Sequence, residues 1–310
     1  MELWFVFALG AALFAAATTI LTKIGLKKVD SHLATAIRTM AALALAWVVV
    51  FSRRTAGEMG TIDARTWVFL VLSGLATGGA WLCRFRALKH QNVNKVTPIT
   101  KCSTILTMLL AFVFLGEPLG WPIAIGMVLM GVGTWLMLEL KKEKKNTRKT
   151  GDGSAVPTQA QGQRTAPMSQ RAWLFFAILA AVFASLTAIF GSIGVADMDA
   201  ALWTALRTII VAIVSWVMVF MTGGQAKIRT VDRKSWVFLL LSGCATGISW
   251  VFFYHALRIG PASLVVPIDQ LSIVVTMGFA RVFLGERFSK QSLIGLAILT
   301  TGILLPSLLA

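Results

Sequence analysis

The sequence predicts an all-α integral membrane protein with ten transmembrane helices, arranged as two inverted five-helix repeats. Three observations predict this fold. The 310 residues are 57% hydrophobic and 14% charged, with a mean hydropathy of +0.78, which is typical of membrane proteins. Continuous apolar runs of about 20 residues, the length that lets a helix cross a bilayer, alternate with polar loops. The second half of the chain repeats the first at a constant offset of 169 residues.

Each apolar run is expected to be a helix, because lipid offers the backbone no hydrogen-bonding partner. The first run is not expected to be a signal peptide, since Glu2 precedes it and no basic segment does. The predicted spans are 3–26, 32–52, 67–88, 95–115 and 121–140 in the first half, and 172–194, 201–221, 236–257, 263–284 and 291–309 in the second.

The repeat divides the chain into residues 1–140, a linker of residues 141–171, and residues 172–310. Trp67 to Leu70 recur letter for letter as Trp236 to Leu239. Because five spans per copy is an odd number, the second copy must enter the membrane in the opposite sense to the first.

Charge predicts the orientation of the chain. The polar linker is rich in Lys and Arg and is expected to be disordered. Basic residues also concentrate in the loops that share its side, even when the linker is left out. The positive-inside rule therefore predicts a cytoplasmic linker and external termini in a bacterial-type inner membrane.

The formal net charge of +16 is explained by these basic loops facing anionic lipid, so no nucleic-acid partner is expected. Cys83, Cys102 and Cys244 lie inside apolar runs without metal-ligand spacing, and we interpret them as packing residues. No metal and no cofactor are expected. No HExxH motif or nucleotide-binding loop is present, and no enzyme activity is predicted.

Two ordered copies of a motif carry a family resemblance. The motif begins at residues 96–99 in the first copy and ends at Gly116 and Glu117. In the second copy it begins at residues 265–268 and ends at Gly285 and Glu286. The spans that begin near Ser73 and Ser242 match in the same way. These segments resemble EamA domains of the drug/metabolite transporter superfamily, and the resemblance covers nearly the whole chain outside the linker.

The resemblance implies a ten-helix transporter with a central cavity lined mainly by helices 3, 4, 8 and 9. It also implies alternating-access transport of a small metabolite. The chain departs from familiar members in its long basic linker and in its charge bias for external termini. Either the topology is reversed, or the charge rule misleads in this chain.

Ionisable residues inside a span are costly and are candidate functional residues. Asp269 and Lys101 follow the matched prolines Pro267 and Pro98, which free backbone carbonyls and often frame a site. The two candidates are a substrate or proton site, or a structural ion pair. Their repeat partners, Thr100 for Asp269 and Gln270 for Lys101, complete the candidate cluster.

Further candidates come from the third span of each copy. Arg86 aligns with His255, and Tyr254 is the only tyrosine in the chain. Trp81 aligns with Trp250, and both are equally compatible with substrate stacking and with packing.

Other repeated residues are interpreted as scaffold. Arg38 and Arg207 are expected to bind neighbouring carbonyls. Glu117 and Glu286 are expected to favour the start of the helix that follows each. Gly74, Gly78, Gly243 and Gly247 predict close helix packing.

The leading hypothesis is a secondary active or facilitative transporter that exports a small polar metabolite, of the amino acid or organic acid type. Protons are a candidate coupling ion through Asp269, and exchange or facilitated efflux stays open. The alternative is a flippase for lipid-linked intermediates. The expected partners are the metabolite and membrane lipids, and both a monomer and a homodimer are compatible with the sequence.

Overall fold

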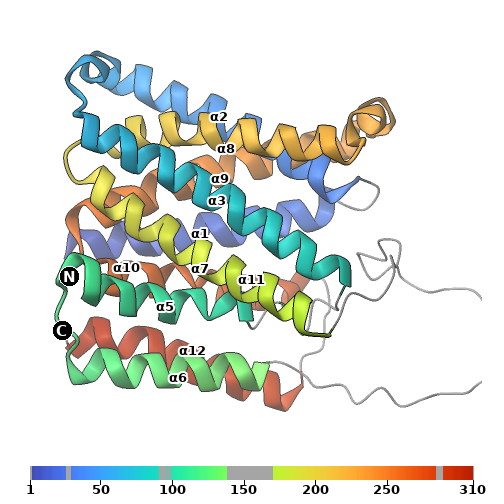
Figure 1. Cartoon of the computed structure of the whole chain (residues 1–310). Helices are drawn as coiled ribbons and strands as arrows, with labels where there is room; N and C mark the ends of the chain where they lie inside the picture. Colours follow the sequence, from blue (N-terminus) through green and yellow to red (C-terminus); the bar gives the residue numbers. More distant parts are fainter. Residues whose placement is uncertain are drawn as a thin grey trace, which may run out of the picture.

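The computed structural model describes residues 2–25, 29–90, 96, 99–137, 170–283 and 289–309, and all regular structure in these ranges is helical. The helices run roughly parallel or antiparallel to one another in a single bundle (Figure 1). They are α1 (Leu3–Gly25), α2 (Ser31–Arg53), α3 (Ala64–His90), α5 (Ser103–Leu110), α6 (Trp121–Met137), α7 (Gln170–Val195), α8 (Ala200–Met221), α9 (Arg233–Ile259), α10 (Ala262–Asp269), α11 (Ser272–Phe283) and α12 (Lys290–Leu309).

Eight helical segments among the described residues are long and apolar enough to cross a membrane, and Ile99–Leu115 and Trp121–Met137 are two shorter apolar ones. Both termini lie at one end of the bundle (Figure 1). Most of the predicted linker lies outside the described residues, but α7 already begins at Gln170, before the predicted boundary at 171.

Capping residues start the second helix of each half. The Asp30 carboxylate accepts a hydrogen bond from His32 N (2.9 Å) at the start of α2. At the repeat-related position, Asp199 accepts from Ala201 N (2.9 Å) and Leu202 N (3.3 Å) at the start of α8. An aspartate at this position satisfies amide groups that have no partner within the helix.

The two halves are interleaved. α1 packs along α9, and α3 packs along α7. The hydroxyls of Thr18 and Thr246 lie 3.2 Å apart, and Thr77 and Thr187, which occupy the matching positions with the halves exchanged, lie 3.3 Å apart. Such hydroxyl contacts hold apolar helices together without a charge.

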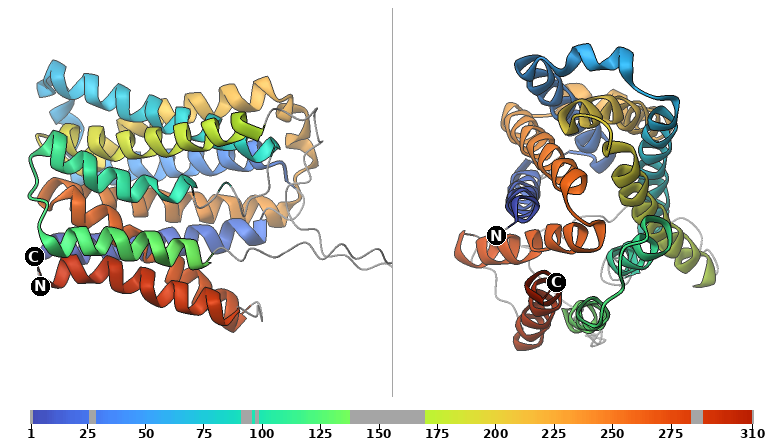
Figure 2. Two further views of the ribbon diagram at one scale, coloured as in Figure 1. Left: turned by 60° about the horizontal axis from the view of Figure 1, so that its bottom comes forward. Right: turned by 90° about the vertical axis from the view of Figure 1, so that its left-hand side faces the viewer.

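Glycines bring two repeat-related helices into backbone contact at the edge of the bundle, where α6 packs along α12 (Figure 2). A Cβ added to Gly133 would lie 2.5 Å from the Leu299 nitrogen, and one added to Gly302 would lie 2.9 Å from the Gly126 oxygen. These distances leave no room for a side chain, so glycine is required at this contact.

The glycines singled out in the sequence also pack closely, as predicted. A Cβ on Gly74 would lie 2.8 Å from the Ile210 side chain, and one on Gly243 would lie 2.4 Å from the Arg38 carbonyl oxygen. These glycines therefore set how closely α3 approaches α8 and α9 approaches α2.

Ion pairs join loops of opposite halves at the two ends of the bundle. Arg53 Nη1 lies 3.5 Å from Asp199 Oδ2 at the end that holds the termini (Figure 1). Lys227 Nζ lies 3.9 Å from Asp30 Oδ2 at the other end. Both cations are largely exposed, so each pair contributes about 1 kcal/mol or less.

Candidate functional site

Two helices are interrupted at repeat-related positions. In the first half the helix that carries Lys101 breaks at Cys102 before α5 begins. In the second half α10 ends at Asp269, and Gln270 and Leu271 form a turn before α11. The predicted spans 95–115 and 263–284 are therefore broken helices rather than continuous ones.

Backbone hydrogen bonds mark the break in the second half. Gln270 N donates to Pro267 O (2.9 Å) and Leu271 N to Ile268 O (2.9 Å), which are shorter turns than those of an α-helix. Pro267 lies inside α10, and its missing amide hydrogen removes a rung on the N-terminal side of the break. The matched Pro98 lies outside the described residues.

Lys101 and Gln270, which occupy equivalent positions in the two copies, contact each other directly. Lys101 Nζ donates a hydrogen bond of 2.6 Å to Gln270 Oε1, across a sequence separation of 169 residues. Asp269 directly precedes Gln270 in the chain, at the end of α10. The structure thus brings Lys101, Gln270 and Asp269 together at the two breaks, with Thr100 adjacent to Lys101 in the chain.

A cavity of about 320 Å³ adjoins this pair. Its wall is mostly apolar and comes from the first break, α6, the turn after α10, α11 and α12. These belong to the fourth, fifth, ninth and tenth predicted spans, so this cavity differs from the one that the resemblance implies, which is lined mainly by helices 3, 4, 8 and 9. The polar side chains in the wall are Lys101, Gln270, Thr104 and Thr134, and the remaining lining residues are Cys102, Ile105, Met130, Gly131, Trp135, Met137, Ile273 and Leu299. An apolar cavity with a few convergent polar groups is the usual form of a small-molecule site.

Arg86 and His255 are not brought together. The exposed Arg86 places its guanidinium 5.3 Å from the centre of the Phe176 ring at the start of α7. His255 packs against Phe7 with the ring centres 4.2 Å apart. These contacts lie at opposite ends of the bundle, so the two residues do not form one site with Lys101.

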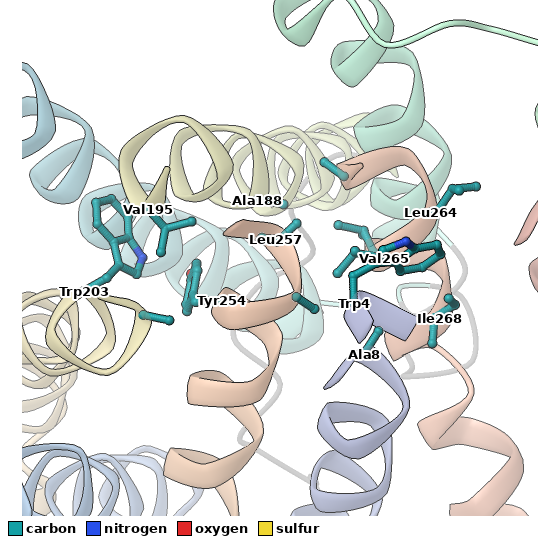
Figure 3. Packing of buried hydrophobic residues seen from close by; sticks show 14 of the residues in the cluster. Trp4, Ala8, Ala188, Val195, Trp203, Tyr254, Leu257, Leu264, Val265 and Ile268 are labelled. Atoms are coloured by element: carbon teal, nitrogen blue, oxygen red, sulfur yellow. The ribbon is translucent and has the colours of Figure 1, made fainter. Parts of the chain in front are cut away.

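Trp250 and Tyr254 lie beside Arg207 rather than beside Lys101. The Arg207 guanidinium carbon is 5.3 Å from the centre of the Trp250 ring and 5.1 Å from that of Tyr254. Figure 3 shows Tyr254 packed between α7 and α8, next to Trp203. Trp81 is half-buried on α3.

The expectation that Arg207 binds backbone carbonyls is wrong. Arg207 donates to hydroxyls of α3, from Nε to Ser73 Oγ at 3.1 Å and from Nη2 to Thr77 Oγ1, rather than to carbonyls. Arg38 likewise donates to the Thr22 hydroxyl at 3.3 Å. Nothing in the sequence distinguishes hydroxyl from carbonyl partners, because the pairing depends on how α3 packs against α8.

Glu117 lies at a helix start, but at that of α10 rather than at that of α6, which follows it. Its carboxylate accepts from Ala262 N at 2.7 Å and from Ser263 N at 2.8 Å. The expectation that Glu117 favours a helix N-terminus is confirmed. The expected helix, α6, is wrong, because the carboxylate contacts α10 of the other half. Glu286 lies outside the described residues.

Comparison with known proteins places the chain in a family. The model of the EamA-like transporter family matches residues 2–139 and again residues 171–308. The chain belongs to the EamA-like transporter family. This family is part of the drug/metabolite transporter superfamily, which confirms the resemblance seen in the sequence. The eight apolar helices are accordingly those of a multi-pass membrane protein of a transporter family.

Two relatives and one solved structure extend the comparison. An uncharacterized transporter from the cobO 3′ region of a Sinorhizobium species is 41% identical over 138 residues, which are 44% of this chain and 97% of the relative. An uncharacterized protein of Methanocaldococcus jannaschii is 30% identical over 77 residues, 25% of this chain and 56% of that protein. A crystal structure covering 99% of both chains superposes with a TM-score of 0.75 at 18% identity, which supports the fold alone.

Proposed function

We propose that this EamA-like transporter exports a small polar metabolite, of the amino acid or organic acid type, by alternating access. The observation that carries the proposal is the Lys101–Gln270 hydrogen bond of 2.6 Å. It joins two broken helices of opposite halves beside a cavity of about 320 Å³. Broken helices of this kind supply the binding groups of many secondary transporters.

The second part of the proposal is a ten-helix inverted repeat. Matched contacts support it, since Thr18–Thr246 and Thr77–Thr187 recur with the halves exchanged. Loops support it as well, because the first loop of one half pairs with the second loop of the other through Asp30 and Lys227. The rocking of two such halves would expose the Lys101 cluster to each side of the membrane in turn.

We assign the coupling role to Asp269. Asp269 ends α10 at the break, directly before Gln270, which accepts the hydrogen bond from Lys101. An acidic side chain inside a membrane span is energetically costly and is by default a functional candidate. The Asp269 carboxylate can take up a proton when the substrate leaves. Proton-driven export is therefore the mechanism to test first.

The test is transport in reconstituted vesicles with an imposed pH gradient. Radiolabelled amino acids and organic acids are screened first with the wild type, and the best substrate is then compared between variants. Asp269→Asn should abolish gradient-driven accumulation but preserve exchange of labelled for unlabelled substrate. The control is Asp63→Asn in the exposed loop before α3, which should transport like the wild type.

Equal gradient-driven accumulation by Asp269→Asn and the wild type would remove the coupling role. Failure of every screened solute to move would remove the transport proposal for these classes.

The proposed orientation places the linker in the cytoplasm and both termini outside an inner membrane of bacterial type. The basic linker and the loop cations Lys227, Arg229, Arg233 and Lys234 at its end of the bundle support it. Reporter fusions at Met1 and Ala310 that fluoresce only in the cytoplasm should stay dark. A bright signal from both fusions would reverse the assignment.

A further inference from the structure

Arg207 is a fully buried cation in the interior of the bundle. Its side chain is 2% exposed, and it extends from α8 towards α3 and α9. Two nitrogens of the guanidinium are occupied, because Nε and Nη2 donate to the hydroxyls of Ser73 and Thr77 on α3. The third nitrogen, Nη1, is buried and has no hydrogen-bond partner.

The surroundings of Arg207 do not neutralise it. Across the described residues, no carboxylate lies within ion-pair distance of its guanidinium. Its neighbours are neutral hydroxyls and the rings of Trp250 and Tyr254, at 5.3 and 5.1 Å. Rings stabilise a cation only partly, and a buried charge without a counter-ion is among the most costly arrangements in a protein.

The equivalent residue in the first half has a different environment. Arg38 is only partly buried and donates to Thr22. Phe85 stands where the second half has Tyr254, and its ring packs on His32 at 4.5 Å. An unpartnered buried nitrogen is recorded for Arg207 and not for Arg38 within the described chain, so the two arginines are not equivalent.

We propose that Arg207 binds the carboxylate group of the transported solute between α3 and α9, at a second position separate from the Lys101 cavity. The anion supplies the missing counter-charge and the missing acceptor for Nη1. Only Nη1 is left for the anion, because the paired edge of Nε and Nη2, which could clamp a carboxylate or a phosphate, already donates to Ser73 and Thr77. We name a carboxylate because the proposed solute is of the amino acid or organic acid type.

The site joins the two halves of the protein. Ser73 and Thr77 belong to the first half, whereas Arg207, Trp250 and Tyr254 belong to the second. Because Arg207 is buried, the site is closed in this structure, and entry of a solute requires the helices around Arg207 to move apart. The inference deepens the proposed transport function and rests on it.

The experiment measures binding to the full-length protein in detergent by isothermal titration calorimetry. The probes are acetate, propionate and benzoate, each compared with its neutral amide at the same ionic strength. The variants are Arg207→Lys, which keeps the charge, Arg207→Gln, which removes it, and the matched control Arg38→Gln. Size-exclusion chromatography checks that each variant is monodisperse.

At least one acid should bind the wild type ten times more tightly than its amide. Arg207→Gln should abolish that preference, Arg207→Lys should weaken it at least tenfold, and Arg38→Gln should change it less than twofold. If Arg207→Gln does not fold, Arg207→Lys alone decides.

The inference is overturned if no acid is preferred over its amide, or if the preference survives both substitutions or is lost equally in Arg38→Gln. These results are independent of transport. Acid binding without movement of any bound acid would refute the transport proposal and keep the site, while transport without acid preference would refute the site alone.

Discussion

Substitution of Glu117 by alanine tests how strongly one half holds the first segment of the broken helix in the other. The carboxylate accepts two amide hydrogen bonds, of 2.7 and 2.8 Å, at the start of α10. Ala262 is 0% and Ser263 is 3% exposed. The first amides of a helix have no acceptor within it, so the substitution leaves two buried donors without partners.

The magnitude follows from those two bonds. Each buried amide left unsatisfied costs about 1–3 kcal/mol, and the loss of an acid at a helix N-terminus adds about 0.3–1 kcal/mol. Glu117 itself is half-exposed, so water can reach part of the site and reduce the loss. We expect Glu117→Ala to lower the free energy of unfolding by about 2 kcal/mol and Glu117→Gln, which keeps one acceptor oxygen, by about half as much.

The assay is unfolding in mixed micelles of increasing SDS fraction, followed by circular dichroism. Glu58→Ala, in the exposed turn η2 (Thr55–Thr61), is the matched control and should change the free energy of unfolding by less than about 0.5 kcal/mol. A loss below about 0.5 kcal/mol for Glu117→Ala would refute the reasoning, because it would mean that water replaces the carboxylate at no cost.

Three further pairs of substitutions test the packing, turns and caps by the same unfolding assay. Gly133→Ala should destabilise the protein by about 1–3 kcal/mol through overpacking, because the added Cβ would lie 2.5 Å from Leu299 N. Its control is Gly278→Ala in α11, where an added Cβ would meet nothing within 4 Å and should not destabilise. Equal losses of stability would contradict the proposed backbone contact. Arg54 has a φ of 59°, and its repeat partner Gly223 has a φ of 67°. Arg54→Gly should therefore stabilise the protein by up to about 1 kcal/mol, and Gly223→Arg should destabilise it by about 1 kcal/mol. Effects of the same sign would count against backbone strain at this turn. Asp199→Ala should cost about 1–2 kcal/mol and Asp30→Ala about 1 kcal/mol, because Asp199 caps two amides and Asp30 caps one, while each pairs with one exposed cation. A greater loss at Asp30 would be the contrary result.

The sequence was sufficient for the helical class, because apolar runs of membrane-crossing length have one stable backbone arrangement in lipid. It was also sufficient for the close glycine contacts. It singled out Lys101 and Gln270 as aligned candidates, but the hydrogen bond between them depends on how the two halves pack. The breaks at Cys102 and Gln270 were less predictable in extent. A proline marks where a rung of the ladder is lost, but neighbouring helices decide whether the chain kinks or stops.

The sequence could not predict which residues of opposite halves bind each other. Glu117 was assigned to the next helix in the chain, and Arg207 to nearby carbonyls, since local spacing favours neighbours. Both instead contact elements more than 100 residues away. Arg86 and His255 were grouped because they align, yet alignment within a repeat gives equivalent positions and not proximity. Two equivalent residues of the repeat lie close together only where the two copies contact each other.

The Lys101–Gln270 contact is one such place, and it has a consequence for the origin of the fused chain. If one unfused copy paired with an identical copy in the same way, this point would hold two lysines or two glutamines. Two ammonium groups 2.6 Å apart would repel strongly in an apolar interior, and two glutamines would carry no charge. Fusion of the copies into one chain allows the two positions to diverge, so that a single cation with a neutral acceptor can occupy the meeting point. A duplicated gene can thus acquire a chemistry there that a self-paired ancestor could not.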